Sequence, residues 1–231
     1  MEIRVTHDGS HTLYSPELNE NYHSINGAVD ESTHVFIEAG LKPVLQAKKG
    51  IYVLEVGFGT GLNAWLSACY VQKNYPDSLV SYVALEPYPV PPEIIGQLNY
   101  TQAPVSNSLS PMRELYYQLH ETPWETETKV LYNQFHLRKF PVRLEEFKPY
   151  WLFDLIFYDA FAPGKQPEMW EKSLFKSLYD KTVPGGTLVT YCAKGQFKRD
   201  LREIGWEVES LPGPTGKREM TRAIKPLTAG L

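Results

Sequence analysis

Three closely spaced glycines, Gly57, Gly59 and Gly61, follow the apolar run IYVLEV and precede a segment with helical periodicity. Glycine permits tight turns and a close approach of the backbone to a ligand, and the first turn of the next helix offers unpaired N–H groups. The segment is typical of a nucleotide-cofactor loop, with a purely structural turn as the alternative. Because the spacing is G-x-G-x-G and not the dinucleotide pattern G-x-G-x-x-G, it favours S-adenosylmethionine over a nicotinamide cofactor.

An acidic residue ends the strand expected after this loop. Glu86 follows the run Ser81–Leu85 and precedes several prolines, which cannot extend a strand. A carboxylate there can accept hydrogen bonds from both ribose hydroxyls of a nucleoside, although a solvated loop residue is the alternative. Glu55 and Asn63 flank the loop and could contact the amino-acid part of the cofactor, or Asn63 could cap a helix. The residues expected around the cofactor are Glu55, Gly57, Phe58, Gly59, Gly61, Asn63, Glu86 and Pro87.

A second carboxylate, Asp159, follows Phe153–Tyr158, a nearly continuous apolar run typical of a strand buried on both faces of a parallel sheet. Phe161 comes two residues later. Such a carboxylate can hydrogen-bond an attacking amine, orient its lone pair and accept its proton, while the ring stacks on a base. Asp159 and Phe161 are therefore the candidate catalytic residues, and a turn cap with core packing is the alternative.

Alternating strand and helix patterns position these residues. Helices are expected at Glu31–Gly40, after Gly61, at Pro167–Asp180 and at Gln196–Ile204, and strands at Ile51–Val56, Ser81–Leu85, Phe153–Tyr158 and Thr187–Tyr191. Trp206–Leu211 and Lys217–Ala223 are joined by so short a loop that they must be antiparallel. The pattern predicts an α/β fold, a doubly wound Rossmann-like sheet with one reversed edge strand in an antiparallel C-terminal hairpin.

We expect a single domain over residues 1–231. An N-terminal cap at 1–45, with a strand pair around Asp8 and Gly9, precedes a Rossmann-like core at 46–231. A segment rich in Tyr and Trp, at about 100–128, is predicted to be a small inserted helical lobe. Its helical face is expected to consist of Met112, Leu115, Tyr116 and Leu119.

Composition excludes several classes of protein. Hydrophobic residues make up 42% and charged residues 22% of the chain, which is ordinary for a globular protein. Because no apolar run approaches the roughly 18 residues of a membrane helix and the N-terminus lacks a signal-peptide pattern, we expect a cytoplasmic protein without a membrane partner. Cys69 and Cys192 do not suggest a disulfide framework. The histidines lack metal-ligand spacing, so no metal is expected.

The net charge of −4 does not indicate a general nucleic-acid binder. Basic residues nevertheless outnumber acidic ones from Thr190 onward, so a local basic face is one interpretation and an ordinary solvated surface is the other. The basic residues of this stretch are Lys194, Lys198, Arg199, Arg202, Lys217, Arg218, Arg222 and Lys225.

Five sequence blocks occur in a fixed order: YHS-x-x-GA-x-x-ES, EVGFGTGLN, DAFAP with QPEMW, TYCAKG and LPGPTGKREM. With them, the chain from about Tyr14 to Ala223 resembles the methyltransferase domain of the MnmC-type tRNA modification proteins. The resemblance implies methyl transfer from S-adenosylmethionine to the exocyclic amine of 5-aminomethyl-2-thiouridine at the tRNA wobble position, which forms 5-methylaminomethyl-2-thiouridine. It implies that Asp159 is the catalytic acid–base or orienting residue and that the tRNA anticodon stem-loop is the partner.

The chain departs from that family in three respects. It has no FAD-dependent oxidase domain, so a separate enzyme is expected to supply the aminomethyl uridine. The region FPVRLEEF replaces a Gly-Asp pair that often contacts adenine, which leaves this contact open between Arg143, Glu145 and their neighbours. Its acidic charge implies a restricted tRNA footprint. The expected substrate-binding residues are Tyr22, His23, Ser24, Lys194, Lys217 and Arg218, with a half-buried loop histidine as the alternative for His23.

Two other functions are considered. A nicotinamide-dependent oxidoreductase could use a similar α/β sheet, but the glycine spacing and the lack of an evident hydride-transfer residue disfavour it. A non-catalytic RNA-binding or scaffold protein could retain the fold, but Asp159 and the intact glycine loop argue against it.

Overall fold

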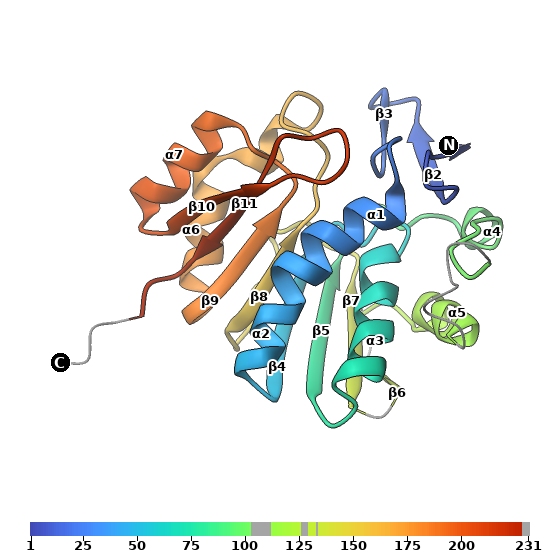
Figure 1. Ribbon diagram of the computed structural model, residues 1–231, viewed down its shortest axis with the longest axis horizontal. Coiled ribbons are helices and arrows are strands. Elements are labelled where there is room, and N and C mark those ends of the chain that lie inside the picture. Colours follow the sequence, from blue (N-terminus) through green and yellow to red (C-terminus); the bar gives the residue numbers. More distant parts are fainter. Residues whose placement is uncertain (103–111, 126–128, 133, 228–231) are drawn as a thin grey trace.

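The computed structural model describes residues 1–102, 112–125, 129–132 and 134–227. At its centre lies one mixed sheet of eight strands (Figure 1). In order across the sheet these are β10 (Glu207–Pro212), β11 (Glu219–Ile224), β9 (Thr182–Thr190), β8 (Phe153–Tyr158), β4 (Gly50–Val56), β5 (Leu79–Leu85), β7 (Phe135–Phe140) and β6 (Lys129–Tyr132).

The five inner strands from β9 to β7 pair in parallel, as expected for strands that alternate with crossover helices. All six residues of β8 are buried, because helices cover both faces of the sheet there. The predicted C-terminal hairpin is confirmed, since β10 and β11 pair antiparallel. The reversed strand of the hairpin is not at the edge as predicted. It is β11, which pairs with β9 and leaves β10 outermost, because the α7 crossover carries the chain one strand position past β9. A second reversed strand, β6, lies at the opposite edge, where it pairs antiparallel with β7.

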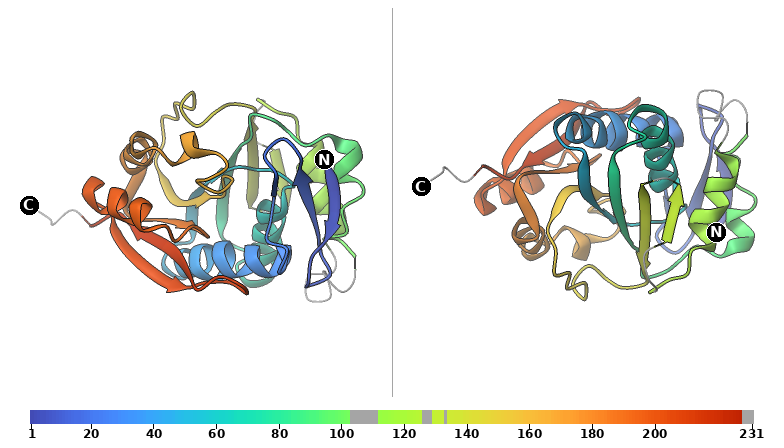
Figure 2. Two further views of the ribbon diagram at one scale, coloured as in Figure 1. Left: turned by 90° about the horizontal axis from the view of Figure 1, so that it is seen from above. Right: turned by 90° about the horizontal axis from the view of Figure 1, so that it is seen from below.

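Helices lie on both faces of the sheet, which confirms the doubly wound prediction (Figures 1 and 2). On one face lie α1 (Ala28–Ser32), the π-helical η1 (Thr33–Leu41), α2 (Lys42–Ala47) and α3 (Leu62–Asn74). On the other face lie α6 (Lys172–Asp180) and α7 (Gly195–Ile204). The side chains of β4 point alternately to the two faces of the sheet, each of which carries an apolar core. Ile51 and Val53 belong to the first core, and Leu54 and Val56 belong to the second.

The helix expected at Glu31–Gly40 does not end at the glycine. Helical structure begins at Ala28 and continues through η1 and α2 to Ala47. A Cβ atom on Gly40 would lie 2.9 Å from Val189 Cγ2 and 3.2 Å from Phe157 Cε1. The glycine therefore allows the helix to lie close against the sheet, and it is not a helix stop.

Two other expected boundaries also differ. The helix expected at Pro167–Asp180 is a 3₁₀ turn, η2 (Pro167–Trp170), followed by α6, because Glu171 is extended with φ −69° and ψ 139°. The strand expected at Thr187–Tyr191 is the longer β9, which contains the Pro-Gly-Gly sequence where its register with β8 shifts. An irregularity in the ladder accommodates these residues within the strand.

A small antiparallel sheet precedes the core, formed by β1 (Glu2–Val5), β2 (His11–Ser15) and β3 (Glu20–Asn21). Beside it lie α4 (Pro92–Ile95) and α5 (Arg113–Glu121) (Figures 1 and 2). The apolar face expected for the lobe helix is buried. Residues 103–111 and 126–128 of that predicted lobe lie outside the described residues.

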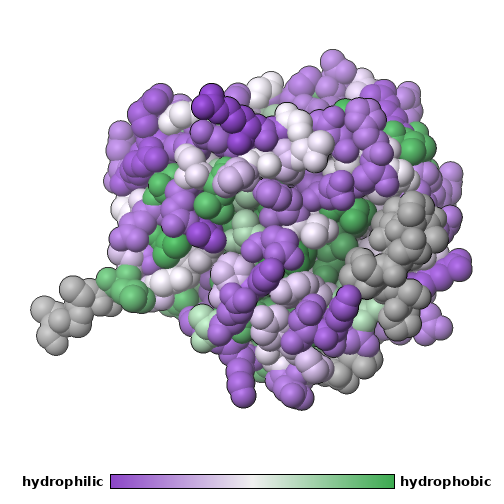
Figure 3. Space-filling view, in the orientation of Figure 1, coloured by the Kyte–Doolittle hydropathy of each residue, from purple (hydrophilic) through white to green (hydrophobic). Residues whose placement is uncertain are grey.

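The surface seen in Figure 3 carries mostly hydrophilic side chains, with smaller apolar areas between them. Within the described residues, every helix is too short or too polar to span a bilayer.

Candidate active site

A cavity of about 590 Å³ lies where β4, β5 and β8 end. β4 lies between β5 and β8, so the connections that follow β4 and β7 lead to opposite sides of β4. Ligands of open α/β sheets bind at such a topological switch point. The small N-terminal sheet and the loop between β10 and β11 complete its wall. The predicted site residues that line it are Tyr22, His23, Ser24, Gly57, Phe58, Gly59, Glu86, Pro87, Asp159, Phe161 and Lys217.

The glycine loop turns tightly at the end of β4. Gly57 has φ +94°, and a Cβ atom there would lie 2.6 Å from the Asp159 carbonyl oxygen. The N–H groups of Gly57 and Phe58 both donate to the Leu85 carbonyl at 3.0 Å. Only glycine combines this backbone angle with so close an approach, so the loop sequence follows from the local geometry.

Glu86 is oriented by the backbone around it. Its carboxylate accepts hydrogen bonds from the N–H groups of Gly59 and Tyr88, each at 3.0 Å. Burial raises the pKa of Glu86, and these two hydrogen bonds oppose that effect. The carboxylate lines the cavity with its position fixed by hydrogen bonds, and a carboxylate can accept hydrogen bonds from the hydroxyls of a ribose.

Glu55, Asn63 and Gly61 lie behind the cavity wall and are not among its lining residues. Glu55 is fully buried, and neither of its carboxylate oxygens receives a well-formed hydrogen bond from the described residues. Burial and the nearby Asp159 raise its pKa well above the usual range, against the effects of Tyr82 and Asn63. A buried carboxyl group with so few partners is unusual in a folded protein, and this one lies directly beneath the glycine loop.

Asp159 lies at the tip of β8, partly exposed to the cavity. Its N–H donates to the Val56 carbonyl at 3.0 Å, and its Oδ2 accepts a hydrogen bond from Asn63 Nδ2 at 2.8 Å. Burial, with a smaller contribution from the charge of Glu31, raises the pKa of Asp159 to about 7, against the lowering effects of Asn63 and Lys217. Such a carboxyl group can exchange a proton near neutral pH.

Phe161 and Tyr22 form an aromatic pair in the cavity. Their ring centroids lie 5.0 Å apart at an interplanar angle of 78°. Trp170 Nε1 donates to the Phe161 carbonyl at 2.8 Å, which fixes the backbone at this point. The pair offers apolar ring surface beside Asp159, against which a planar group can pack.

His23 and Ser24 line the cavity, but their hydrogen bonds are directed into the fold. His23 Nε2 bonds with Thr60 Oγ1 at 2.9 Å, and burial lowers its pKa to about 4. The Ser24 N–H donates to Glu31 Oε1 at 3.0 Å. His23 therefore joins the N-terminal cap to the glycine loop as a neutral side chain.

The basic residues occupy different environments. Lys217 pairs with Glu31 in the cavity wall, whereas Lys194 and Arg218 are exposed and lie outside the lining residues. The proposed basic face is wrong for Lys198. That side chain is buried, and its ammonium group donates to Ser210 Oγ and Glu219 Oε2, both at 2.7 Å.

Tyr88 and Tyr191 line the cavity without having been predicted from the sequence, whereas Arg143 was one of the candidates left open for the adenine contact. Tyr88 and Arg143 meet at the rim, where Arg143 Nη2 donates to the Tyr88 hydroxyl at 2.6 Å. Val142 lines the same end, but Glu145 does not. The FPVRLEEF region was a usable signal for Arg143, whereas nothing in the sequence marked Tyr88.

The arrangement fits S-adenosylmethionine. The glycine loop approaches the cavity without side chains, Glu86 presents hydrogen-bond acceptors, and the incompletely bonded Glu55 lies beneath the loop. Among the residues that the structure describes, no group of three or more potential ligand side chains could hold a metal ion.

Comparisons with known proteins agree with this geometry. A family described as S-adenosyl-L-methionine-dependent methyltransferase matches residues 115–226. The tRNA 5-methylaminomethyl-2-thiouridine biosynthesis bifunctional protein MnmC of Cupriavidus necator is 30% identical over 218 residues, covering 91% of this chain and 32% of that protein. The corresponding protein of Idiomarina loihiensis is 29% identical over 217 residues, covering 89% and 36%. The chain thus spans about a third of the length of these curated relatives.

A solved structure matches over the whole chain. The crystal structure of MnmC2 from Aquifex aeolicus superposes with a TM-score of 0.76 and 26% sequence identity, covering all of this chain and 71% of that one. The spacing of the glycine loop and these matches disagree with a nicotinamide-dependent oxidoreductase. These matches identify the chain as an S-adenosyl-L-methionine-dependent methyltransferase that is similar to about a third of the length of the MnmC proteins.

Proposed function

We propose that this methyltransferase methylates the exocyclic amine of 5-aminomethyl-2-thiouridine at the wobble position of tRNA, forming 5-methylaminomethyl-2-thiouridine. The observation that carries the proposal is Asp159, which lies beside the Phe161 and Tyr22 rings in the cavity that the glycine loop enters. The names of the similar MnmC proteins, which refer to biosynthesis of this methylated nucleoside, support the choice of acceptor.

The cofactor, when bound, supplies an electrophilic methyl group on a sulfonium centre. Glu86 would accept hydrogen bonds from the ribose hydroxyls, and the backbone of the glycine loop would lie against the cofactor. Tyr88, Val142 and Arg143 would flank the adenine at the other end of the cavity. Glu55 and Asn63 would face the amino-acid part from beneath the loop.

Asp159 would act on the acceptor amine. An amine attacks only through a free lone pair, so it must be neutral, and a carboxylate that accepts an N–H hydrogen bond orients that lone pair. The new N–C bond would form as the methyl–sulfur bond of the sulfonium breaks, which leaves a neutral thioether, and the nitrogen would lose a proton that a carboxylate oxygen of Asp159 accepts. Asn63 holds the carboxylate through its 2.8 Å hydrogen bond. Phe161 and Tyr22 would pack against the uracil ring.

The remaining assignments concern the domain and its partners. The described residues would form one methyltransferase domain, with the cap at 1–45 and the lobe at about 100–128 packed on the core. Lys194 and Arg218, both exposed, would contact phosphates of the anticodon stem-loop. An enzyme activity outside these residues would supply the aminomethyl uridine.

The test is methyl transfer from labelled S-adenosylmethionine to tRNA from cells that lack the endogenous activity, with mass spectrometry of the digested nucleosides. We expect one added methyl group on 5-aminomethyl-2-thiouridine. Asp159→Asn is the matched control, because it keeps the shape of the side chain but removes the base. It should bind the cofactor yet lose about 10²-fold or more of the rate. A scaffold protein would show no transfer, and transfer to another nucleoside would identify a different acceptor.

A further inference from the structure

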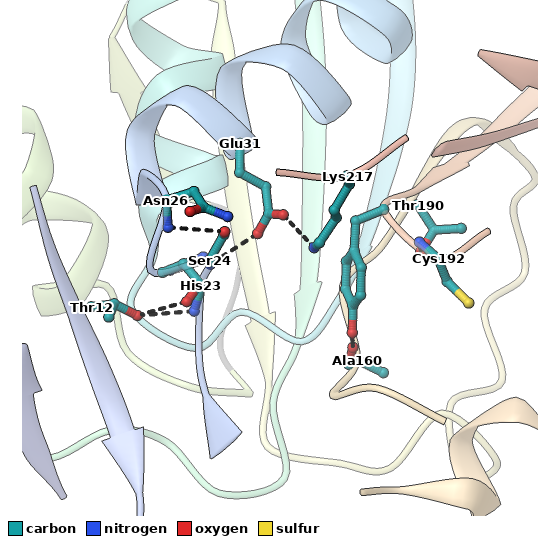
Figure 4. A network of polar contacts seen from close by, with 10 residues as sticks. Thr12, His23, Ser24, Asn26, Glu31, Ala160, Thr190, Cys192 and Lys217 are labelled. Atoms are coloured by element: carbon teal, nitrogen blue, oxygen red, sulfur yellow. Dashed lines mark hydrogen bonds and ion pairs between the residues drawn. The ribbon is translucent and has the colours of Figure 1, made fainter. Parts of the chain in front are cut away.

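Glu31 connects two segments of the cavity wall. It is 6% exposed, its Oε1 accepts a hydrogen bond from the Ser24 N–H at 3.0 Å, and its Oε2 forms an ion pair with Lys217. Figure 4 shows the two charged groups pointing toward each other, Glu31 from α1 and Lys217 from the loop between β10 and β11. Residues far apart in the sequence thus form one charged pair at the cavity.

The loop that carries Lys217 packs directly on the N-terminal cap. A Cβ atom on Gly216, which has φ +82°, would lie 2.0 Å from Asn26 Nδ2. The His34 ring Nε2 also bonds with the Pro212 carbonyl oxygen at 2.8 Å. Because the Asn26 and His34 side chains lie against the backbone of this hairpin, the position of Lys217 is well defined.

A chain of contacts leads from Lys217 to the backbone beside Asp159. The Lys217 ammonium lies 4.0 Å from the centroid of the Tyr191 ring. The Tyr191 hydroxyl donates to the carbonyl of Ala160, the residue after Asp159, at 2.8 Å. Asp159, Glu31, Tyr191 and Lys217 all line the cavity.

We propose that Glu31 and Lys217 are positioning residues, a charge pair that fixes the electrostatic field at Asp159 and so decides when its carboxylate is ready to accept a proton. The two charges have opposite electrostatic effects on Asp159, so removal of one residue leaves the effect of the other uncompensated. The use of that proton in amine methylation rests on the proposed function. The effect of the Glu31–Lys217 pair on Asp159 does not depend on it.

Other titratable groups also lie near Asp159. Burial raises the pKa values of Tyr82 and Tyr191, which favours their neutral forms, and burial together with the nearby Asp159 raises the pKa of Glu55. Asn63 has no charge to lose. Glu31 and Lys217 act on Asp159 in opposite directions, and Glu55 is a further carboxyl group coupled to it. The groups that face it are Glu55 of β4, Tyr82 of β5, Asn63 of α3, Tyr191 after β9, Glu31 of α1 and Lys217 of the hairpin loop.

The test is a titration of the Asp159 carboxyl carbon by NMR in protein labelled with ¹³C-aspartate, where Asp159→Asn identifies the signal. In Glu31→Gln the unpaired Lys217 should lower the Asp159 midpoint by about one pH unit, and in Lys217→Met the unpaired Glu31 should raise it similarly. The double variant should titrate near the wild-type pH. Lys217→Arg, which keeps the positive charge, should restore the wild-type midpoint.

Opposite shifts distinguish this role from a structural one. A merely structural pair would give no shift, or shifts in one direction with loss of thermal stability, and either result would overturn the proposal. If Glu31→Gln does not fold, Lys217→Met and Lys217→Arg still decide the matter, because only the former should shift. Lys172→Met, which removes an exposed ion pair with Glu203, is the control and should leave the titration unchanged.

The same variants separate this inference from the proposed function. With active enzyme, the acidic limb of the pH profile for methyl transfer should move with the Asp159 midpoint. Opposite NMR shifts in a protein that methylates no tRNA would support the charge pair and refute the proposed acceptor.

Discussion

Replacing Gly57 with alanine tests whether the cofactor loop depends on the close approach of β4 to the tip of β8. The new Cβ atom would lie 2.6 Å from the Asp159 carbonyl oxygen and 3.2 Å from its carbonyl carbon. Both atoms belong to the backbone, so a side-chain rotation cannot relieve the contact. Either the loop or the residue that carries the proposed base must move.

The expected loss of stability has two parts. A left-handed backbone angle costs a residue other than glycine about 1–2 kcal/mol, and forced overpacking costs about 1–3 kcal/mol. Alanine also lowers the conformational entropy of the unfolded chain, which offsets about 0.4–1 kcal/mol of this loss. We therefore expect Gly57→Ala to lower the free energy of unfolding by about 3 kcal/mol, a large share of the roughly 5–15 kcal/mol of a typical domain.

Urea unfolding followed by circular dichroism measures this change, and calorimetry measures S-adenosylmethionine affinity on the same sample. Gly164→Ala is the matched control, because Gly164 has no atoms within 4 Å of the position of a Cβ and its φ is not positive. The control should change stability by less than about 1 kcal/mol. If Gly57→Ala unfolds at the same urea concentration as Gly164→Ala and binds the cofactor equally well, the close approach does not constrain the loop.

Three further results are expected. Methyl transfer should rise as the pH increases through about 7, because the pKa of Asp159 is raised to that value and the deprotonated form is the base; a pH profile that is flat from 6 to 8 would contradict this role. Glu86→Gln should weaken cofactor binding by about 10- to 100-fold in calorimetry, since charge-assisted hydrogen bonds are worth about 1.5–3 kcal/mol. Thr60→Val should lower the free energy of unfolding by about 2–4 kcal/mol in urea, because the buried His23 and Tyr100 side chains would lose their hydroxyl partner; unchanged stability would show that they find others.

The sequence predicted the part of the site that depends on strand order. The glycine loop, Glu86 and Asp159 each follow an apolar strand, and parallel strands end at one edge of a sheet. Their presence around one cavity therefore follows from local patterns alone. The chemical roles assigned to them remain predictions, because geometry places a carboxylate but does not show its ligand.

Element boundaries were harder to predict where tertiary packing overrides local preference. Gly40 suggested a helix end, but it lies against Val189 and Phe157, and both contacts form only after the sheet has assembled. After α7 the chain places β10 one strand position away from β9, and β11 then fills the gap between them. A hairpin pattern shows that two strands are antiparallel, but it does not say which of them joins the sheet.

Charge is the property that sequence composition resolves least. Lys198 and Lys217 both come from the basic C-terminal region, yet Lys198 is buried against Ser210 and Glu219, whereas Lys217 pairs with Glu31 across 186 residues of sequence. A lysine that contacts phosphate must leave its ammonium group free, and one that sets the field at a base must be paired and held nearby. Only the fold decides between these environments, so the count of basic residues could not show that Lys198 is buried and that Lys217 lies in the wall of the cavity, while Lys194 and Arg218 are exposed.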